Sequence, residues 1–438
     1  MILNNIDVDS VTYRRPEYEA HAAQIELVGS VYAGIDTAVE LLNQLPNEYD
    51  NGFAVRRVEC TLDNYVERIV STMAGQVNRK ALTYDGVPAG IVDAMDTVGG
   101  HEDLNQFVVD ITKDAIRDGK VFVLVDMSIG EPKFHKVLRS QLVNWRQDSD
   151  GVFTMAVILE GYTENTGLFG LEQGVQYRVI DAEGNVSIYR SNGSGWVIVE
   201  EIKTSYSFCP LFEFTLGDIP PLYDIARINV KHMNFVSIKD RFLKEAQDPI
   251  LFGRGLGIDS AGSPDNPVVV LGVNQMMNTD NVEADLSWVE LDGSNYDIAE
   301  RNIAKLEDDM TDRAIKMEEG GGVKTATQVS QENSESTSRL SDIATELENV
   351  LNRALGAYSL IRYSKELTGT VIVNRDFNSA AIDSNSLTAL NTLQVSGNLS
   401  RKSLLEAVNN SELVEIEDID EELLLIESET PKEDSDIM

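Results

Sequence analysis

The stretch PPLYDIARINVKHMNFVSIKDRFLKEAQD, residues 220–248, decides how the surrounding sequence is interpreted. The two prolines at its start suit the first turn of a helix. Asp248 precedes Pro249, and the residue before a proline avoids helical geometry. A helix of about 27 residues within 218–248 would span roughly 40 Å, because each residue adds about 1.5 Å. That is long for a compact domain.

The apolar residues of this stretch fall on two nearly opposite sides of the predicted helix. The first stripe is Leu222, Ile225, Ala226, Met233, Val236 and Leu243, and the second stripe is Ile228, Phe235, Ile238 and Phe242. An ordinary surface helix has one apolar stripe, so two stripes predict a helix that is covered from both sides. Burial inside one large domain and packing between neighbouring copies in a ring both explain this pattern. In a ring, the residues expected between subunits are Leu222, Ile225, Ile228, Phe235, Val236, Ile238, Phe242 and Leu243.

Upstream of this helix the sequence predicts an α+β domain. Apolar residues at helical spacing mark helices over residues 16–42, 61–80 and 102–118, and Gly119 ends the last of them as a C-cap. Short β-rich runs separated by turn signals fill residues 119–216. They indicate an antiparallel β-meander that packs on the helices.

Downstream, glycine and proline interrupt residues 249–293, with candidate strands at 268–273 and 287–291. This part is too small for a core of its own and is predicted to be an excursion between two helices. The segments expected after it are a helix over 295–318, a glycine break at 320–322, a third long helix to about Tyr363, a strand at 371–373, small helices beginning near Leu387 and Ser400, and an acidic tail from Ser411.

The third long helix has an unusual first half. Residues 330–338 are nearly all polar, whereas the second half carries an apolar stripe that includes Leu347, Leu351 and Leu355. A polar helix start without a core face is typical of a segment that lines a water-filled space.

Composition restricts the function classes. The chain has 438 residues, and 73 acidic against 36 basic residues give a formal charge of −37. Tight nucleic-acid binding requires clustered Lys and Arg, so this balance argues against it, although a repulsive wall would suit a channel that does not hold a polyanion. No apolar run reaches the ~20 residues of a membrane span. Cys60 and Cys209 are too few for a disulfide framework, which indicates a reducing cytoplasm.

The motifs of enzymes and of metal sites are not found. There is no phosphate-binding loop, no nucleophile elbow and no His or Cys cluster with metal-ligand spacing. The glycine-rich segment 253–257 is predicted to be a flexible loop, and Asp148 to Gly151 is predicted to be a turn rather than a calcium loop. We therefore expect no catalytic, cofactor-binding or metal-ligating residue.

The order of these segments resembles the portal proteins, or head-to-tail connectors, of tailed bacteriophages. Local segments share the resemblance: QLVNWR at 141–146, QYRVI at 176–180, PPLYDIARINVKH at 220–232, the helix end around Pro249, and KTATQ at 324–328. Each segment is weak alone, and their order and spacing carry the likeness over most of residues 60–365.

The resemblance implies a role for each part of the chain. The expected parts are a wing at 1–217 with a return strand at about 368–379, stem helices at 218–248 and 295–318, a clip at 249–294, a tunnel loop at 319–325, a long helix from stem to crown at 326–364, and a crown with an acidic tail at 380–438. The tunnel loop, close to DNA, would comprise Glu319, Gly320, Gly321, Gly322, Val323, Lys324 and Thr325. Lys324 would either touch phosphates without reading sequence or be simply exposed.

The resemblance also implies partners. Portal subunits form a twelve-fold ring at one capsid vertex of the virion, assembled in the host cytoplasm, and double-stranded DNA passes through the ring during packaging and ejection without sequence-specific contact. Further partners would be the major capsid and scaffolding proteins, the terminase packaging motor and a neck or tail adaptor, with no membrane and no cofactor. The alternatives are another virion neck or adaptor ring protein and an acidic cytoplasmic enzyme.

Overall fold

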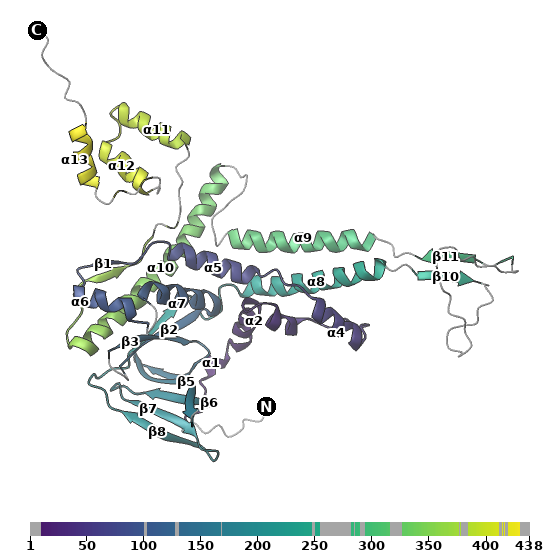
Figure 1. Ribbon diagram of the computed structural model, residues 1–438, viewed down its shortest axis with the longest axis horizontal. Coiled ribbons are helices and arrows are strands. Elements are labelled where there is room, and N and C mark those ends of the chain that lie inside the picture. Colours follow the sequence, from purple (N-terminus) through teal and green to yellow (C-terminus); the bar gives the residue numbers. More distant parts are fainter. Residues whose placement is uncertain are drawn as a thin grey trace, which may run out of the picture. The chain divides into compact units, whose positions relative to one another are not determined.

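The computed structural model describes residues 10–99, 103–127, 131–167, 169–247, 250–254, 282–283, 285–289, 294–315, 326–375, 377, 384–410, 414, 416 and 419–429. The chain forms two compact units, residues 1–78 with 82–373 and residues 79–81 with 374–438 (Figure 1). Helices and antiparallel sheets are mixed, which confirms the α+β class.

The first part of the large unit is helical. Its elements are α1 (Pro16–Glu19), α2 (Ala22–Tyr32), α3 (Ile35–Ala38), a 3-10 turn (Val39–Leu41), α4 (Asp50–Glu59), α5 (Tyr65–Val77), α6 (Ala89–Val92), a second 3-10 turn (Asp93–Thr97) and α7 (Leu104–Asp118). The expectation of one helix over 16–42 is wrong, because Gly34 has a φ of 104° and breaks it. Helix α7 ends as expected, at a left-handed Gly119 with a φ of 81°.

Helix α4 is absent from the sequence-based expectations. Only Arg56 of this helix is buried. Because its buried position carries a charged residue, α4 lacks the apolar spacing by which a helix is predicted from sequence. The next helix, α5, begins later than expected, because the Asn64 side chain accepts a hydrogen bond from the Glu67 N–H and caps it.

Two antiparallel sheets replace the single expected meander. One has the order β3-β2-β9 and the other the order β4-β5-β6-β7-β8. Their strands are β2 (Lys120–Asp126), β3 (Lys133–Leu138), β4 (Leu142–Gln147), β5 (Phe153–Thr166), β6 (Gly170–Ile180), β7 (Val186–Ser191), β8 (Trp196–Ile202) and β9 (Leu211–Thr215). Buried residues of both sheets share a core, with Phe122 and Leu211 from the first and Ile158, Ile180 and Ile188 from the second.

The expected turns at 148–151 and 182–185 join β4 to β5 and β6 to β7, with positive φ angles at Gly151 and Gly184. The long β5–β6 hairpin, paired as far as Thr166 with Gly170, was not predicted. Most of its outer residues are exposed, so they lack the alternation of apolar and polar residues that marks a half-buried strand.

The long helices follow the sheets. Their elements are α8 (Tyr223–Gln247), β10 (Ile250–Arg254), β11 (Asp285–Val289), α9 (Ser294–Ile315), α10 (Ala326–Tyr363) and β12 (Thr370–Ile372), which pairs with β1 (Thr83–Asp85). Strand β10 pairs with β11, so Gly253 and Arg254 lie in a strand and not in the expected flexible loop. The candidate strand at 268–273 lies outside the described residues. The second half of α10 is buried through residues that include Leu347, Leu351 and Leu355.

The small unit contains α11 (Ser384–Val395), α12 (Arg401–Asn410) and α13 (Ile419–Glu429). The Ser403 N–H donates to Ser400 Oγ at 3.0 Å, which is the cap expected at Ser400. Lys402 and Asp420 form an ion pair at 2.6 Å between α12 and α13. In the described parts of both units, no helix combines the length and the hydropathy that crossing a membrane requires.

Candidate interaction surface on the long helices

Helix α8 is packed on two flanks. Helix α9 runs beside it on one flank, and α2, α4 and α5 contact it elsewhere (Figure 1). In the first stripe, Leu222, Ala226 and Met233 are fully buried and Ile225 is 3% exposed. Leu222 and Ile225, expected between subunits, therefore belong to the chain's own core. Val236 and Leu243 of the same stripe are half-buried.

The second stripe is less covered. Ile228, Phe235, Ile238 and Phe242 are all half-buried. Helix α9 has a single buried stripe, made of Ile303, Leu306, Met310 and Ala314, and α9 is packed on α8. Burial inside one chain thus accounts for the first stripe as far as Met233, and only partly for Val236, Leu243 and the second stripe. The second stripe, together with Val236 and Leu243, is the apolar part of α8 that remains partly exposed.

The DNA-proximal residues expected from the resemblance cannot be placed. Residues 319–325, the expected tunnel loop, lie outside the described residues, as do the side chains of the polar segment 330–338. Only the helical backbone of α10 is described over that segment.

Two of the buried polar residues of α8 contact neighbouring helices. Asn229 is 0% exposed and His232 is 1% exposed. Asn229 Nδ2 donates to the Asp63 carbonyl at 2.8 Å, and Asn229 Oδ1 accepts from the Tyr65 N–H at 3.1 Å. His232 Nε2 lies 3.0 Å from Glu307 Oε1. The two side chains therefore link α8 to the start of α5 and to α9.

Asp63, His232 and Glu307 bring one possible ligand atom each to within 4.8 Å of one another. Carboxylate and imidazole groups are common ligands of divalent cations. A histidine that binds a metal almost always donates its other ring N–H to an acceptor, whereas His232 Nδ1 is buried without a hydrogen-bond partner. The arrangement fits a hydrogen bond from Nε2–H to Glu307 better than it fits a metal site.

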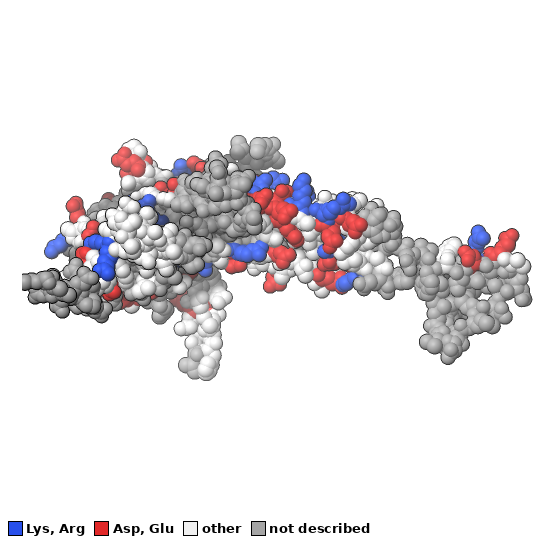
Figure 2. Space-filling view, turned by 90° about the horizontal axis from the view of Figure 1, so that it is seen from above, with Lys and Arg blue, Asp and Glu red and all other residues white. Residues whose placement is uncertain are grey.

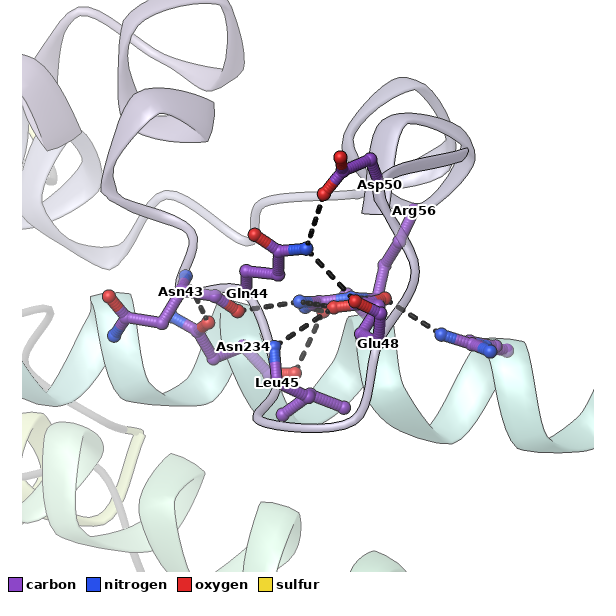
Figure 3. Close-up of polar contacts among 9 residues, drawn as sticks. Asn43, Gln44, Leu45, Glu48, Asp50, Arg56 and Asn234 are labelled. Carbon is purple, nitrogen blue, oxygen red and sulfur yellow. Dashed lines mark hydrogen bonds and ion pairs between the residues drawn. The ribbon is translucent and has the colours of Figure 1, made fainter. Parts of the chain in front are cut away.

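A buried ion pair attaches α4 and the preceding loop to α8 (Figure 3). Arg56 Nε and Nη2 donate to the two carboxylate oxygens of Glu48 at 2.9 and 2.8 Å, and both side chains are 1% exposed. From α8, Arg241 Nη1 donates to Glu48 at 2.8 Å and Ser237 Oγ accepts from Arg56 at 3.0 Å. Hydrogen bonds from Arg56 lower the pKa of the Glu48 carboxyl to about 2.

Sequence reasoning missed both polar groups. Asn229 and His232 were visible in the segment 220–232, but their partners at Asp63, Tyr65 and Glu307 are distant in sequence. Glu48 and Arg56 are eight residues apart, and such a pair is ordinary in a chain this rich in charge. The signal that could have found them is a polar residue placed on the apolar side of a helix, as Asn229 is.

The two thiols give no sign of nucleophilic chemistry. Burial raises the pKa of Cys209 to about 12 and raises the pKa of Cys60 as well. Reactive cysteines have lowered pKa values and some exposure, and both thiols are buried. Neither thiol therefore has the environment of a catalytic cysteine.

Comparison with known proteins gives one family match. Residues 221–359, which include α8, β10, β11, α9 and most of α10, match a family described as a domain of unknown function, DUF4055. The matched stretch is less than half of the chain. None of the curated proteins matches the chain.

Three similar chains occur in solved structures of a gene transfer agent (GTA) particle. A chain in the virion of a native particle is 11% identical, with 86% of this chain and 96% of that chain covered and a TM-score of 0.43. A chain in the neck of an empty particle is 11% identical, with coverages of 82% and 94% and a TM-score of 0.40. A chain in the neck of a native particle computed with C12 symmetry is 11% identical, with coverages of 78% and 88% and a TM-score of 0.37.

Proposed function

We propose that the chain is a portal subunit that forms a ring at one vertex of a virion capsid. Double-stranded DNA would pass through the central channel during packaging and ejection. One observation carries this proposal: α8 and α9 are antiparallel, a small β excursion joins them, and the second stripe of α8 stays half-buried. A partly exposed apolar stripe marks a surface that binds a partner. Lateral packing between neighbouring copies in a ring would cover this stripe.

Charge supports passage of DNA without tight binding. The formal charge of −37 repels phosphates, and binding to DNA depends on basic residues that release counterions. In this proposal the acidic wall of the channel repels the DNA phosphates and does not bind them. Residues 319–325 would approach the DNA backbone, with Lys324 as their one basic side chain.

The remaining parts would serve the other partners of a portal. The α/β body would face the capsid and scaffolding proteins. Residues 249–294 would meet the packaging motor and later the neck or tail adaptor. Residues 380–438 would form the crown. A neck or adaptor ring protein is the second candidate, and the helix–excursion–helix order favours the portal over it. The environments of the two thiols weigh against a cysteine-dependent enzyme.

Native mass spectrometry of the purified chain tests the proposal. A portal subunit is expected to give a closed ring of about twelve copies, because rotational closure satisfies every lateral contact. A monomer or a dimer over a wide range of protein concentration and salt would contradict the proposal. Rings made outside a capsid can differ in copy number, so a ring of neighbouring size supports it equally.

A further inference from the structure

The hydrogen bond between His232 and Glu307 fixes the register of α8 against α9. The two atoms are 3.0 Å apart, and Arg313 of α9 lies 3.9 Å from Asp224 of α8, so the helices are antiparallel. Both helices rise about 1.5 Å per residue. Moving toward the start of α8 is therefore matched by moving toward the end of α9, and the two contacts agree on the register to within two residues, or about 3 Å.

This register places opposite charges at equal heights. Arg227 lies five residues before His232, and Asp312 lies five residues after Glu307. Lys231 and Asp308 are each one residue from the same contact. Arg227 and Lys231 on α8 thus share their heights with Asp312 and Asp308 on α9.

These four charges do not meet within the chain. All four residues are exposed, and none forms an ion pair within the described part of the chain. Arg227 and Lys231 instead lie over the rings of Tyr223, at 5.9 Å, and Phe235, at 5.7 Å, on α8 itself. Since charges at equal height stay apart, the basic flank of α8, with Arg227 and Lys231, and the acidic face of α9, with Asp308 and Asp312, point in different directions. Arg301 and Lys305 are also exposed on that side of α9, two turns nearer its start. Figure 2 shows basic and acidic residues exposed along the stretch where α9 runs.

Apolar residues at matching heights also lie on α8 and α9, further along the two helices. Phe242 of the second stripe is half-buried and lies ten residues after His232. The matching height on α9 is Asp297, and its neighbour Ile298 is 51% exposed. Each flank therefore carries an apolar group that is at least partly exposed at one height and, at another, a pair of charges without an ion-pair partner in the described residues, in the same order.

We propose, on the basis of the ring proposed above, that the lateral contact joins unlike flanks of neighbouring copies. The basic flank of α8 in one copy would meet the acidic face of α9 in the next, with Arg227 opposite Asp312, Lys231 opposite Asp308 and Phe242 opposite Ile298. Copies that differ only by rotation about an axis along the helices keep each residue at its height. Such a head-to-tail contact closes into a ring, because each copy offers both flanks once.

Charge inversion tests this pairing more sharply than charge removal, because a single exposed pair contributes little and like charges repel. The variants are R227E/K231E, D308K/D312K and the combination of all four. Each double variant is expected to lose the ring by native mass spectrometry, measured in a low-salt buffer in which the unmodified chain is first shown to assemble. The fourfold variant is expected to regain it. The matched control is R146E/K203E, which inverts two exposed basic residues of the α/β body and should keep the ring.

The outcomes separate this inference from the proposed function. If the unmodified chain forms no ring, the proposed function fails. If the ring forms and both double variants keep it, or if the fourfold variant fails to regain it, the pairing is overturned and the portal proposal stands. Circular dichroism of each variant identifies loss of folding.

Cross-linking tests the pairing of α8 with α9 of the next copy even if a charge variant unfolds. In the K231C/D308C variant, a short thiol cross-linker is expected to join neighbouring copies into a ladder of covalent oligomers on a denaturing gel. K231C alone should give no ladder. Rings of K231C/D308C that yield only single chains would overturn the pairing.

Discussion

The pair formed by Arg56 and Glu48 shows how single residues determine the position of a helix. Arg56 is the buried residue of α4, and Glu48 receives hydrogen bonds from Arg56 and from Arg241 of α8. A buried charge is costly unless it is paired, so this group specifies one placement of α4 against α8.

Removing one charge of this pair is expected to destabilise the fold. Glu48→Gln leaves the Arg56 guanidinium buried beside a neutral amide, which costs roughly 3–5 kcal/mol. Urea denaturation of the purified chain measures the loss. The matched control is Glu40→Gln, since Glu40 pairs with Arg57 of the same helix at the surface, and an exposed pair contributes about 0–1 kcal/mol. Equal losses in the two variants would contradict the assigned role of Glu48.

The pH dependence of the free energy of unfolding should also reveal the contribution of Glu48. The folded-state pKa of Glu48 is about 2, below the value of about 4.3 for an unperturbed glutamate. A lowered pKa contributes stability that is fully present above the unfolded value and is lost as the pH falls toward the folded value. The stability difference between the unmodified chain and Glu48→Gln should therefore shrink from about pH 4.3 down to 2. A difference that grows as the pH falls would have the wrong sign.

Helices and turns that depend on residues close together in the sequence could be predicted from the sequence. Helix α7 follows from its apolar spacing and from Gly119, and the turns at 148–151 and 182–185 follow from their glycines and acidic side chains. Strand pairing over a long sequence distance was not predictable. Strand β2 pairs with β9, about ninety residues later, and no local pattern records that choice. The expected meander is therefore confirmed for β4 to β8 and was wrong for β2, β3 and β9, which form a second sheet.

The stripes of α8 illustrate what periodicity does and does not determine. Helical spacing predicted two faces that need cover, and the chain itself covers the first of them as far as Met233. The spacing could not say which face the same chain covers, because that depends on α2, α4, α5 and α9. The structure buries Leu222 and Ile225 in the chain and leaves Phe235 and Ile238 half-buried. The polar partners of Asn229 and His232 were unpredictable for the same reason.

The two stripes should respond differently to a buried charge. Met233→Asp places a carboxylate in a fully buried position, so the monomer itself should unfold at lower urea concentration. Ile238→Asp changes a half-buried residue of the second stripe, so the folded chain should persist while the ring is lost. Circular dichroism measures the fold, and light scattering measures assembly. A ring that survives Ile238→Asp would remove the second stripe from the lateral contact.

The net charge of the whole chain affects its assembly into a ring. A chain with a formal charge of −37 repels its own copies, so a ring requires specific lateral contacts to overcome that repulsion. The half-buried second stripe supplies apolar area, and the unsatisfied charges at matched heights on α8 and α9 supply local attraction. Raising the salt concentration weakens both the general repulsion and the local pairing, so assembly should depend on ionic strength.

Electron microscopy of the purified chain, with class averages of end-on views, tests whether the chain forms a portal ring. We expect closed rings, because head-to-tail contacts that close by rotation give rings, with about twelve copies, as the resemblance to portal proteins implies, and with a central channel wide enough for a DNA duplex. Monomers, dimers or open filaments without a channel, seen across a range of protein and salt concentrations, would contradict it.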